Sequence, residues 1–167
     1  MIDNATPIDP AKGLLHARHF QIAYATNDLD KAKALFTRRY GIARYTPLGG
    51  PLASGGEIAV ALAWVGGVMI ELLCATGPGT DIYRHGCPEN EGFQLWHHHL
   101  GYLVESDGPW DALMAMAARE GHAIPHISHN AGFMKSCFIE APELGHLLEY
   151  ICPEPSGSAF FNAVERN

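Results

Sequence analysis

The stretch Gly67–Glu71 (GVMIE) is repeated 78 positions later as Gly145–Glu149 (GHLLE). At the same offset, Gln21–Tyr24 (QIAY) matches His99–Tyr102 (HLGY). Two short matches that share one offset are much harder to obtain by accident than either match alone. The sequence therefore predicts a fold made of two similar halves.

One helix is predicted in each half. Asn27-Asp28 forms a start signal for the first helix, apolar residues then recur at helical spacing, and Gly41 ends it. The second helix is expected to begin at Asp107 and to end at Gly121. The start and stop signals of both helices are 14 positions apart, which agrees with a duplication.

The strands complete the same order in both halves. Short runs with strand character follow each helix and are separated by turn signals such as Gly66-Gly67. We therefore expect the order β-α-β-β-β twice. The predicted strands are Arg18–Thr26, Ala43–Pro47, Glu57–Val65 and Val68–Cys74 in the first half, and a strand around His99, His122–Ile127, Phe133–Glu140 and His146–Cys152 in the second.

The chain of 167 residues is long enough for one well-buried α+β domain built from these two modules. The linker between the modules is rich in Gly, Pro and polar residues, and its length predicts a lid or a segment that contacts the substrate. The tail carries Phe160, Phe161 and Val164 and is compatible with a short docking helix. The predicted divisions are 1–167 for the domain, 17–75 for the first module, 76–96 for the linker, 97–153 for the second module and 154–167 for the tail.

The composition excludes several classes of partner. A formal net charge of −7 argues against nucleic acid or an anionic membrane surface, because both are bound by basic patches. No apolar stretch approaches the roughly 20 residues that span a bilayer, and the first residues lack the basic start and apolar core of a secretory signal. We therefore expect a cytoplasmic protein without a nucleic-acid or membrane partner.

The repeat also aligns four residues able to bind a metal, because its offset pairs Gln21 with His99 and Glu71 with Glu149. Side chains alternate along a strand, so the four are able to share one sheet face. Burying two carboxylates together is strongly unfavourable unless a cation compensates their charge. We therefore predict one divalent ion (Ni, Co, Mn, Mg or Zn) held by two residues of each half. The alternative is that the glutamates are solvated at strand ends and that the histidine is a satisfied core residue.

Alternation also assigns the neighbours of these residues to a face. His97 shares the face of His99, where it either supports the site or is purely structural. His98 points to the opposite face and is expected to be structural. Phe20 also points to the opposite face, where we expect it to pack against the helices.

Two further features concern the substrate. Ala23 and Gly101 each lie next along a strand from a predicted ligand and leave room for a bound molecule. Arg84 and His85, in the linker, are candidates for clamping an anionic group such as a carboxylate or a CoA phosphate. A lone arginine in a loop is, however, usually solvated.

These motifs resemble the vicinal oxygen chelate superfamily, which includes glyoxalase I, methylmalonyl-CoA epimerase, extradiol dioxygenases and bleomycin-resistance proteins. The resemblance covers nearly the whole chain and implies paired βαβββ modules that form an open half-barrel sheet around one metal, in a homodimer. It rests on Gln21–Tyr24, Asn27–Ala32, Ile70–Leu73, His98–Tyr102 and Gly145–Tyr150. By this resemblance, the metal ligands are Gln21, Glu71, His99 and Glu149.

The resemblance further implies a metal-dependent isomerase, epimerase or lyase that acts on a small carbonyl compound, such as a thioester or a thiol adduct. Glu149 would be the base that removes a proton next to the carbonyl, and Glu71 the opposing carboxylate that returns it. The sequence around Glu71 lacks the longer motif of glyoxalase I, so a glutathione substrate is not assigned.

Two other functions stay open. One is a non-catalytic protein that binds a hydrophobic small molecule in the same cavity. The other, with less support, is an iron-dependent ring-cleaving dioxygenase. Those dioxygenases use two histidines and one carboxylate, whereas Gln21 stands where the first histidine would be.

Overall fold

The computed structural model describes residues 8–167 and contains one sheet of eight strands in the order β2-β3-β4-β1-β5-β8-β7-β6. The first half contains β1 (Arg18–Thr26), α1 (Leu29–Tyr40), β2 (Thr46–Pro51), β3 (Glu57–Val65) and β4 (Val68–Thr76). The second half contains β5 (Leu95–Leu103), α2 (Asp107–Glu120), β6 (His126–Asn130), β7 (Met134–Ala141) and β8 (His146–Pro153). Shorter elements are η1 (Pro10–Lys12), η2 (Asp81–Arg84), η3 (Pro142–Leu144) and the C-terminal helix α3 (Pro155–Ala163).

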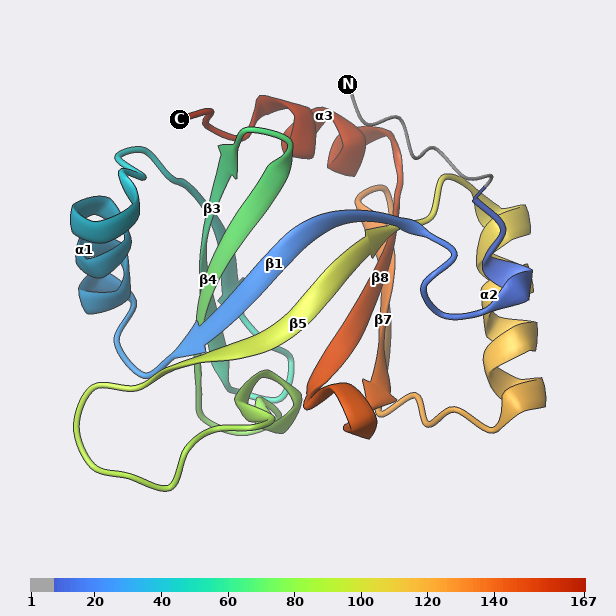
Figure 1. Cartoon of the computed structure of the whole chain (residues 1–167), viewed down its shortest axis with the longest axis horizontal. Coiled ribbons are helices and arrows are strands. Elements are labelled where there is room, and N and C mark those ends of the chain that lie inside the picture. The colour runs from blue at the N-terminus through green and yellow to red at the C-terminus, as the bar shows by residue number, and fades with distance from the viewer. Residues whose placement is uncertain (1–7) are drawn as a thin grey trace.

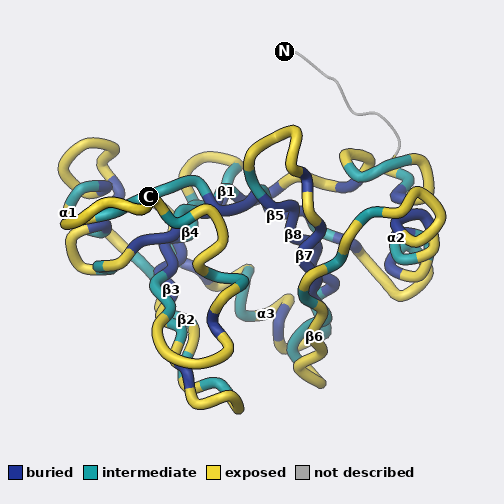
Figure 2. Tube along the Cα trace, turned by 90° about the horizontal axis from the view of Figure 1, so that it is seen from below, coloured by how far each residue is buried: buried dark blue, intermediate teal, exposed yellow. Residues whose placement is uncertain are grey.

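The two halves meet along the β1–β5 pair, which is antiparallel. On either side of it, β1 pairs with β4 and β5 pairs with β8, both in parallel. The register is the same in both halves, because Ala23 lies opposite Glu71 and Gly101 lies opposite Glu149. Figure 2 shows the resulting arch, with β2 and β3 forming one leg and β6 and β7 the other. The predicted α+β fold of paired βαβββ modules in an open half-barrel is confirmed.

Both long helices begin and end where the sequence predicts. The side chain of Asp28 caps α1 by accepting a hydrogen bond from the backbone N–H of Lys31 at 3.0 Å, which satisfies one of the free donors at a helix start. Gly41 and Gly121 end α1 and α2 in the left-handed conformation, with φ of 73° and 75°. Glycine adopts this conformation without a steric penalty.

Helices α1 and α2 cover the outer face of the sheet, one on each half (Figure 1). Phe36 of α1 packs with residues of β3 and β4, and Trp110 of α2 packs with residues of β5, β7 and β8. A third apolar cluster contains Val60, Met69 and Ile151 and receives Phe161 from α3. Seen from below, α3 lies between the two legs of the arch (Figure 2). The inner side of the arch is therefore partly filled by the tail.

The two edge strands differ from the prediction. β2 runs over Thr46–Pro51 rather than Ala43–Pro47, and β6 runs over His126–Asn130 rather than His122–Ile127. β2 includes Gly49, Gly50 and Pro51, which the sequence alone suggests are loop residues. Proline and glycine are tolerated there because an edge strand pairs on one side only. In β2 that pairing is with β3.

Two irregularities in the β1–β5 ladder change which side chains share a face. The register shifts between His19 and Gln21, which leaves Phe20 without a partner in β5. It shifts again between Ala23 and Tyr24, which leaves His98 without a partner in β1. A β-bulge of this kind breaks the simple alternation of side chains. Phe20 accordingly belongs to the third apolar cluster, with Phe161, and the prediction that it packs against the two module helices, α1 and α2, is wrong.

None of the helices within residues 8–167 has the length and apolar content that crossing a membrane requires.

Candidate functional site

A cavity of about 410 Å³ lies on the inner side of the arch and is lined by residues of both halves. Gln21 of β1 and Glu71 of β4 line it from the first half, and Glu149 of β8 lines it from the second. His99 of β5 lies directly behind this surface, because its Nε2 is 3.0 Å from Oε2 of Glu149. The structure thus brings three of the four predicted ligands to the wall of one cavity and the fourth, His99, into contact with Glu149 behind it.

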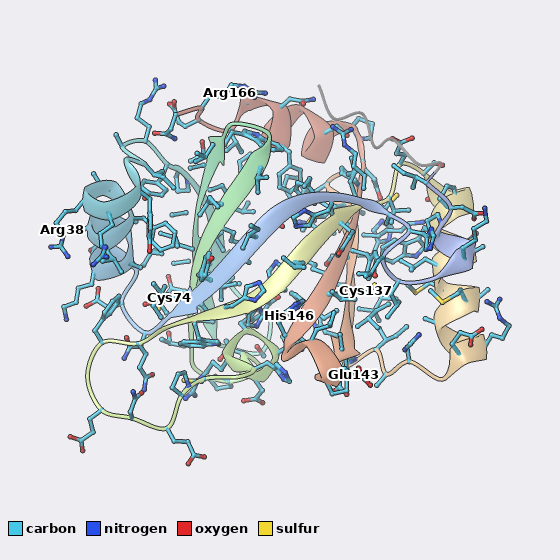
Figure 3. The ribbon with its side chains drawn as sticks, viewed as in Figure 1. Arg38, Cys74, Cys137, Glu143, His146 and Arg166 are labelled. Carbon is cyan, nitrogen blue, oxygen red and sulfur yellow. The ribbon has the colours of Figure 1, made fainter. Side chains whose placement is uncertain are left out.

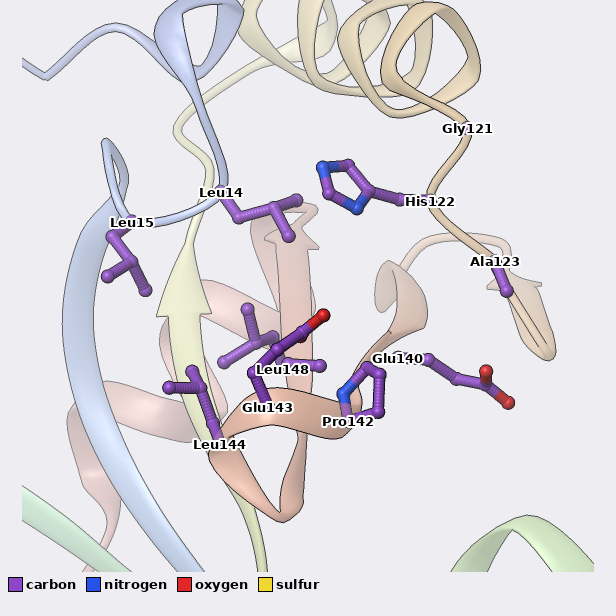
Figure 4. A pocket seen from close by; sticks show the side chains of 11 residues that line it. Leu14, Leu15, Gly121, His122, Ala123, Glu140, Pro142, Glu143, Leu144 and Leu148 are labelled. Carbon is purple, nitrogen blue, oxygen red and sulfur yellow. The ribbon is translucent and has the colours of Figure 1, made fainter.

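A second cavity, of about 390 Å³, lies between the segment before β1, the end of α2 and η3 (Figure 4). Leu14, His122 and Glu143 are among its lining residues, and none of the four predicted ligands is. It is therefore separate from the candidate site.

Gln21 and Glu71 form the first contacting pair. The amide Nε2 of Gln21 donates a hydrogen bond to Oε2 of Glu71 at 2.5 Å. Gln21 is 2% exposed, and its side chain fills the space next to Gly101 on β5, where a Cβ atom would lie only 2.7 Å from Cβ of Gln21. The absence of a side chain at Gly101 therefore makes room for Gln21, rather than for substrate directly.

The environment of Glu71 disfavours its ionised form. Burial raises the pKa of Glu71 to about 7, and the charge of Glu149 adds to this increase, while His99 and the amide of Gln21 oppose it. A buried carboxylate of this kind is stabilised by a nearby positive charge. Of the four residues, only His99 is able to carry one in the protein alone.

His99 and Glu149 form the second pair. Burial alone would lower the pKa of His99, but the negative charges of Glu149 and Glu71 outweigh burial, so the pKa of His99 lies above its usual value. Nε2 of His99 is fully buried and, within residues 8–167, finds no hydrogen-bond partner in suitable alignment, although the Glu149 oxygen is close. A divalent cation would take the place of the proton on this nitrogen and would supply the positive charge that the two carboxylates favour.

His98 determines which nitrogen of His99 faces the carboxylates. Nε2 of His98 lies 2.8 Å from the carbonyl oxygen of Ile82, which only accepts, so this nitrogen carries a proton. Nδ1 of His98 lies 2.8 Å from Nδ1 of His99. Burial, reinforced by the nearby His99, lowers the pKa of His98 to about 3, so His98 is neutral and its Nδ1 accepts. His99 must then donate through Nδ1, which leaves its Nε2 toward Glu149.

The side of the sheet on which His98 lies is therefore different from the predicted one. His98 is completely buried, and the bulge in β5 places its ring against that of His99, with ring centroids 5.1 Å apart. Strand alternation cannot reveal this, because alternation assumes a regular ladder. The signal in the sequence was the run of adjacent histidines itself.

The other residues singled out from the sequence lie outside this arrangement. The ring of His97 contacts Tyr24 and His146, at centroid distances of 5.8 and 4.5 Å. Arg84 is exposed and lies along a different depression of the surface, beside Thr26 and Trp96, while His85 is exposed as well. The structure does not bring the proposed anion clamp to the cavity.

The donor set fits a divalent cation in its chemistry. It offers two carboxylates, an amide oxygen and an imidazole nitrogen, a mixture that suits hard and borderline metal ions. The buried and unsatisfied Nε2 of His99 agrees with this assignment. In residues 8–167, however, no three His, Cys, Asp or Glu side chains stand close enough together to form a metal cage by themselves. The donors stand as two contacting pairs.

Of the comparisons with known proteins, the one with solved structures found proteins of similar architecture. No protein-family model matches the sequence, and no curated protein is similar to it. Among solved structures, the methylmalonyl-CoA epimerase of Mycobacterium tuberculosis is similar, with a TM-score of 0.58 and 17% identity over 95% of this chain and 97% of that chain.

A Streptomyces coelicolor methylmalonyl-CoA epimerase in complex with 2-nitronate-propionyl-CoA has a TM-score of 0.56 and 17% identity, over 82% of this chain and 97% of that chain. A methylmalonyl-CoA epimerase in complex with methylmalonyl-CoA and NH4+ has the same TM-score of 0.56 and 17% identity, over 90% and 99%. The chain therefore has the fold of these epimerases.

Proposed function

We propose that this protein is a divalent-metal-dependent isomerase, epimerase or lyase that moves a proton on the carbon next to a carbonyl group of a small molecule. One observation carries the proposal: two pairs of potential ligands, one from each half, meet at the same cavity through an identical strand register. The fold similarity to methylmalonyl-CoA epimerases supports the epimerase class.

The proposed ligands are Gln21, Glu71, His99 and Glu149. When bound, the cation supplies positive charge beside the substrate oxygens, where it stabilises the negative charge that develops as the proton leaves. His98 holds His99 with Nε2 toward the site. Gln21 is neutral, so it adds a donor oxygen without adding charge.

The two carboxylates carry out different steps of the proton transfer. Glu149 removes the proton from the carbon next to the carbonyl, and Glu71 returns a proton from the other side. They are suited to opposite sides because Glu71 belongs to β4 of the first half and Glu149 to β8 of the second. Apolar lining residues such as Phe138 and Ile151 exclude water, which strengthens the electrostatic interactions within the site.

Deuterium exchange tests the proposal. The metal-loaded protein is incubated in D₂O with methylmalonyl-CoA and with a panel of small 2-oxo and thioester compounds, and loss of the C–H signal is followed by proton NMR. Exchange should be slowed by roughly 100-fold or more in Glu149→Gln, the usual scale for loss of a general base. In Glu71→Gln, exchange should continue, but inversion at the carbon should be lost.

Glu140→Gln is the matched control, because Glu140 is exposed on β7 and lines the second cavity instead. Unchanged exchange in Glu149→Gln on a substrate that the wild type exchanges would overturn the role of Glu149 as base.

A binding protein without catalysis is the second candidate function. The largely apolar lining of the cavity and the lack of a ready-formed cage favour it. This function predicts a hydrophobic ligand whose affinity is the same with and without metal, together with no proton exchange.

A further inference from the structure

The walls of the site cavity are apolar on both sides. Eleven of its lining residues are aliphatic, aromatic, Met or Pro, and they come from both legs of the arch, from β8, from the linker and from the tail. Such a surface favours an uncharged group of the ligand. These eleven residues are Leu48, Pro51, Leu52, Ile58, Val60, Tyr83, Phe133, Met134, Phe138, Ile151 and Phe161.

No positive side chain faces this surface. All 11 lysines and arginines of the chain lie within the described residues, and none of them lines the cavity. Several are engaged elsewhere: Lys135 donates to Asp107 at 2.6 Å, and Arg44 pairs with Glu165 at 3.4 Å. Figure 3 shows Arg38 on the outer side of α1 and Arg166 at the end of the chain. A carboxylate or phosphate inside the cavity would find no counter-charge on its walls.

The metal site that lines the cavity supplies no net counter-charge for an anionic group either. Glu71 and Glu149 carry two negative charges when ionised, and one divalent cation brings their sum to zero. An anionic group beyond the chelating oxygens would therefore gain little Coulomb energy, while it would lose its hydration on entering an apolar cavity.

Two aromatic lining residues of the cavity come from outside the repeated modules. Tyr83 comes from η2 in the linker, and Phe161 comes from α3 in the tail. The indole N–H of Trp64 on β3 donates to the carbonyl oxygen of Phe161 at 3.0 Å, and the backbone N–H of Trp64 donates to that of Glu165 at 2.8 Å. These bonds fix α3 against the sheet, so Phe161 is a built part of the wall.

From these observations we infer that the substrate carries an uncharged apolar group next to the oxygens that the cation binds, and no anionic group inside the cavity. This inference rests on the proposed metal-dependent function and narrows its substrate class. Phe161 and Tyr83 belong to the lining that would contact that group.

The test measures the affinities of three hydroxamates for the Co²⁺-loaded full-length protein by isothermal titration calorimetry. Acetohydroxamate, benzohydroxamate and 4-carboxybenzohydroxamate share one bidentate chelating group and differ only in the attached group. Benzohydroxamate should bind roughly tenfold or more tightly than acetohydroxamate, because it buries a phenyl ring. The added carboxylate should weaken binding by about tenfold or more, because it is desolvated without a partner.

Two pairs of variants locate the effect. Phe161→Ala should reduce the preference for benzohydroxamate more than Phe160→Ala does, because Phe160 does not line the cavity and packs behind the lining residues Phe133 and Phe161. Asn130→Lys adds a cation at an exposed lining position and should restore binding of the carboxylated compound. Asn162→Lys is its control, since Asn162 is exposed on α3 and does not line the cavity.

Equal affinities for the three compounds, or tightest binding of the carboxylated one, would overturn the inferred substrate class and leave the metal site in place. Failure of the protein to hold Co²⁺ would instead overturn the proposed function, and the substrate class with it. The wild-type affinities decide the question even if a variant fails to fold.

Discussion

The two halves of the molecule place the same kind of bulge before the first ligand but put different residues in it. In β1 the unpaired residue is Phe20, which precedes Gln21, and in β5 it is His98, which precedes His99. Phe20 and His98 are 78 positions apart, the offset of the whole repeat. The bulge is therefore common to both halves, while the residue in the bulge differs between them.

The difference follows from what each ligand needs. The amide of Gln21 is held by its own hydrogen bond to Glu71, so the residue before it is free to be apolar and packs with Phe161 at a centroid distance of 6.5 Å. An imidazole has two nitrogens, and a partner must determine which of them faces the site. His98 is that partner for His99, and it connects the pair to Ile82 in the linker.

The largest expected effect comes from replacing His98 with phenylalanine, the residue found at the equivalent position 20 of the first half. His98→Phe removes the acceptor for Nδ1 of His99, so both tautomers of His99 become accessible. Loss of a partner that orients a metal-binding histidine typically weakens metal affinity by about 10- to 100-fold. Calorimetric titration with Co²⁺ measures the affinity, and long-range ¹H–¹⁵N spectra of the Zn²⁺-loaded protein identify the tautomer.

His97→Phe is the matched control, because His97 is the adjacent residue and contacts Tyr24 and His146 instead. Equal metal affinities of the two variants would contradict the assigned difference between the halves.

The small residues next to the ligands give a second comparison. Gly101 is the repeat equivalent of Ala23, but a Cβ at Gly101 would lie 2.7 Å from Cβ of Gln21. Gly101→Ala should therefore displace Gln21 and lower the free energy of unfolding by about 1–3 kcal/mol, the usual cost of overpacking. The reverse change, Ala23→Gly, should cost only about 0.5–1 kcal/mol. Urea denaturation measures both, and a smaller loss in Gly101→Ala than in Ala23→Gly would contradict this account.

Much of this comparison follows from the sequence, and the part that does not has a physical cause. The shared offset identified the paired modules and the four residues that the structure gathers at one cavity. The bulges were not predictable, because they depend on how β1 and β5 pair across the molecule rather than on local periodicity. For the same reason the sequence assigned Phe20 and His98 to the wrong side. It also ended β2 too early, because Gly49-Gly50-Pro51 has loop composition but pairs with β3.

The smallest expected difference is between the wild type and His98→Phe in how the free energy of unfolding depends on pH. The pKa of His98 is about 3 in the folded protein and roughly 6.5 in the unfolded chain. The unfolded chain therefore binds a proton that the folded protein does not, and the free energy of unfolding falls as the pH falls from about 6.5 toward about 3. One such proton contributes a slope of about 1.4 kcal/mol per pH unit.

His98→Phe should lose this contribution to the slope. Urea denaturation of the metal-free wild type and of the metal-free variant is compared at several pH values between about 5 and about 6.5, which lie inside that window. An unchanged slope would mean that His98 is protonated in the folded protein and does not accept from His99.

Metal content tests the central claim most directly. Elemental analysis of the untagged protein is carried out for the wild type and for a Glu71→Ala/Glu149→Ala double variant, which keeps the histidine run at His97–His99 and so reveals any metal bound there adventitiously. The account predicts about one divalent ion per chain in the wild type, the number that neutralises two carboxylates, and its loss in the double variant. Equal metal content in the two proteins, or a wild type that binds none when metal is supplied, would contradict it.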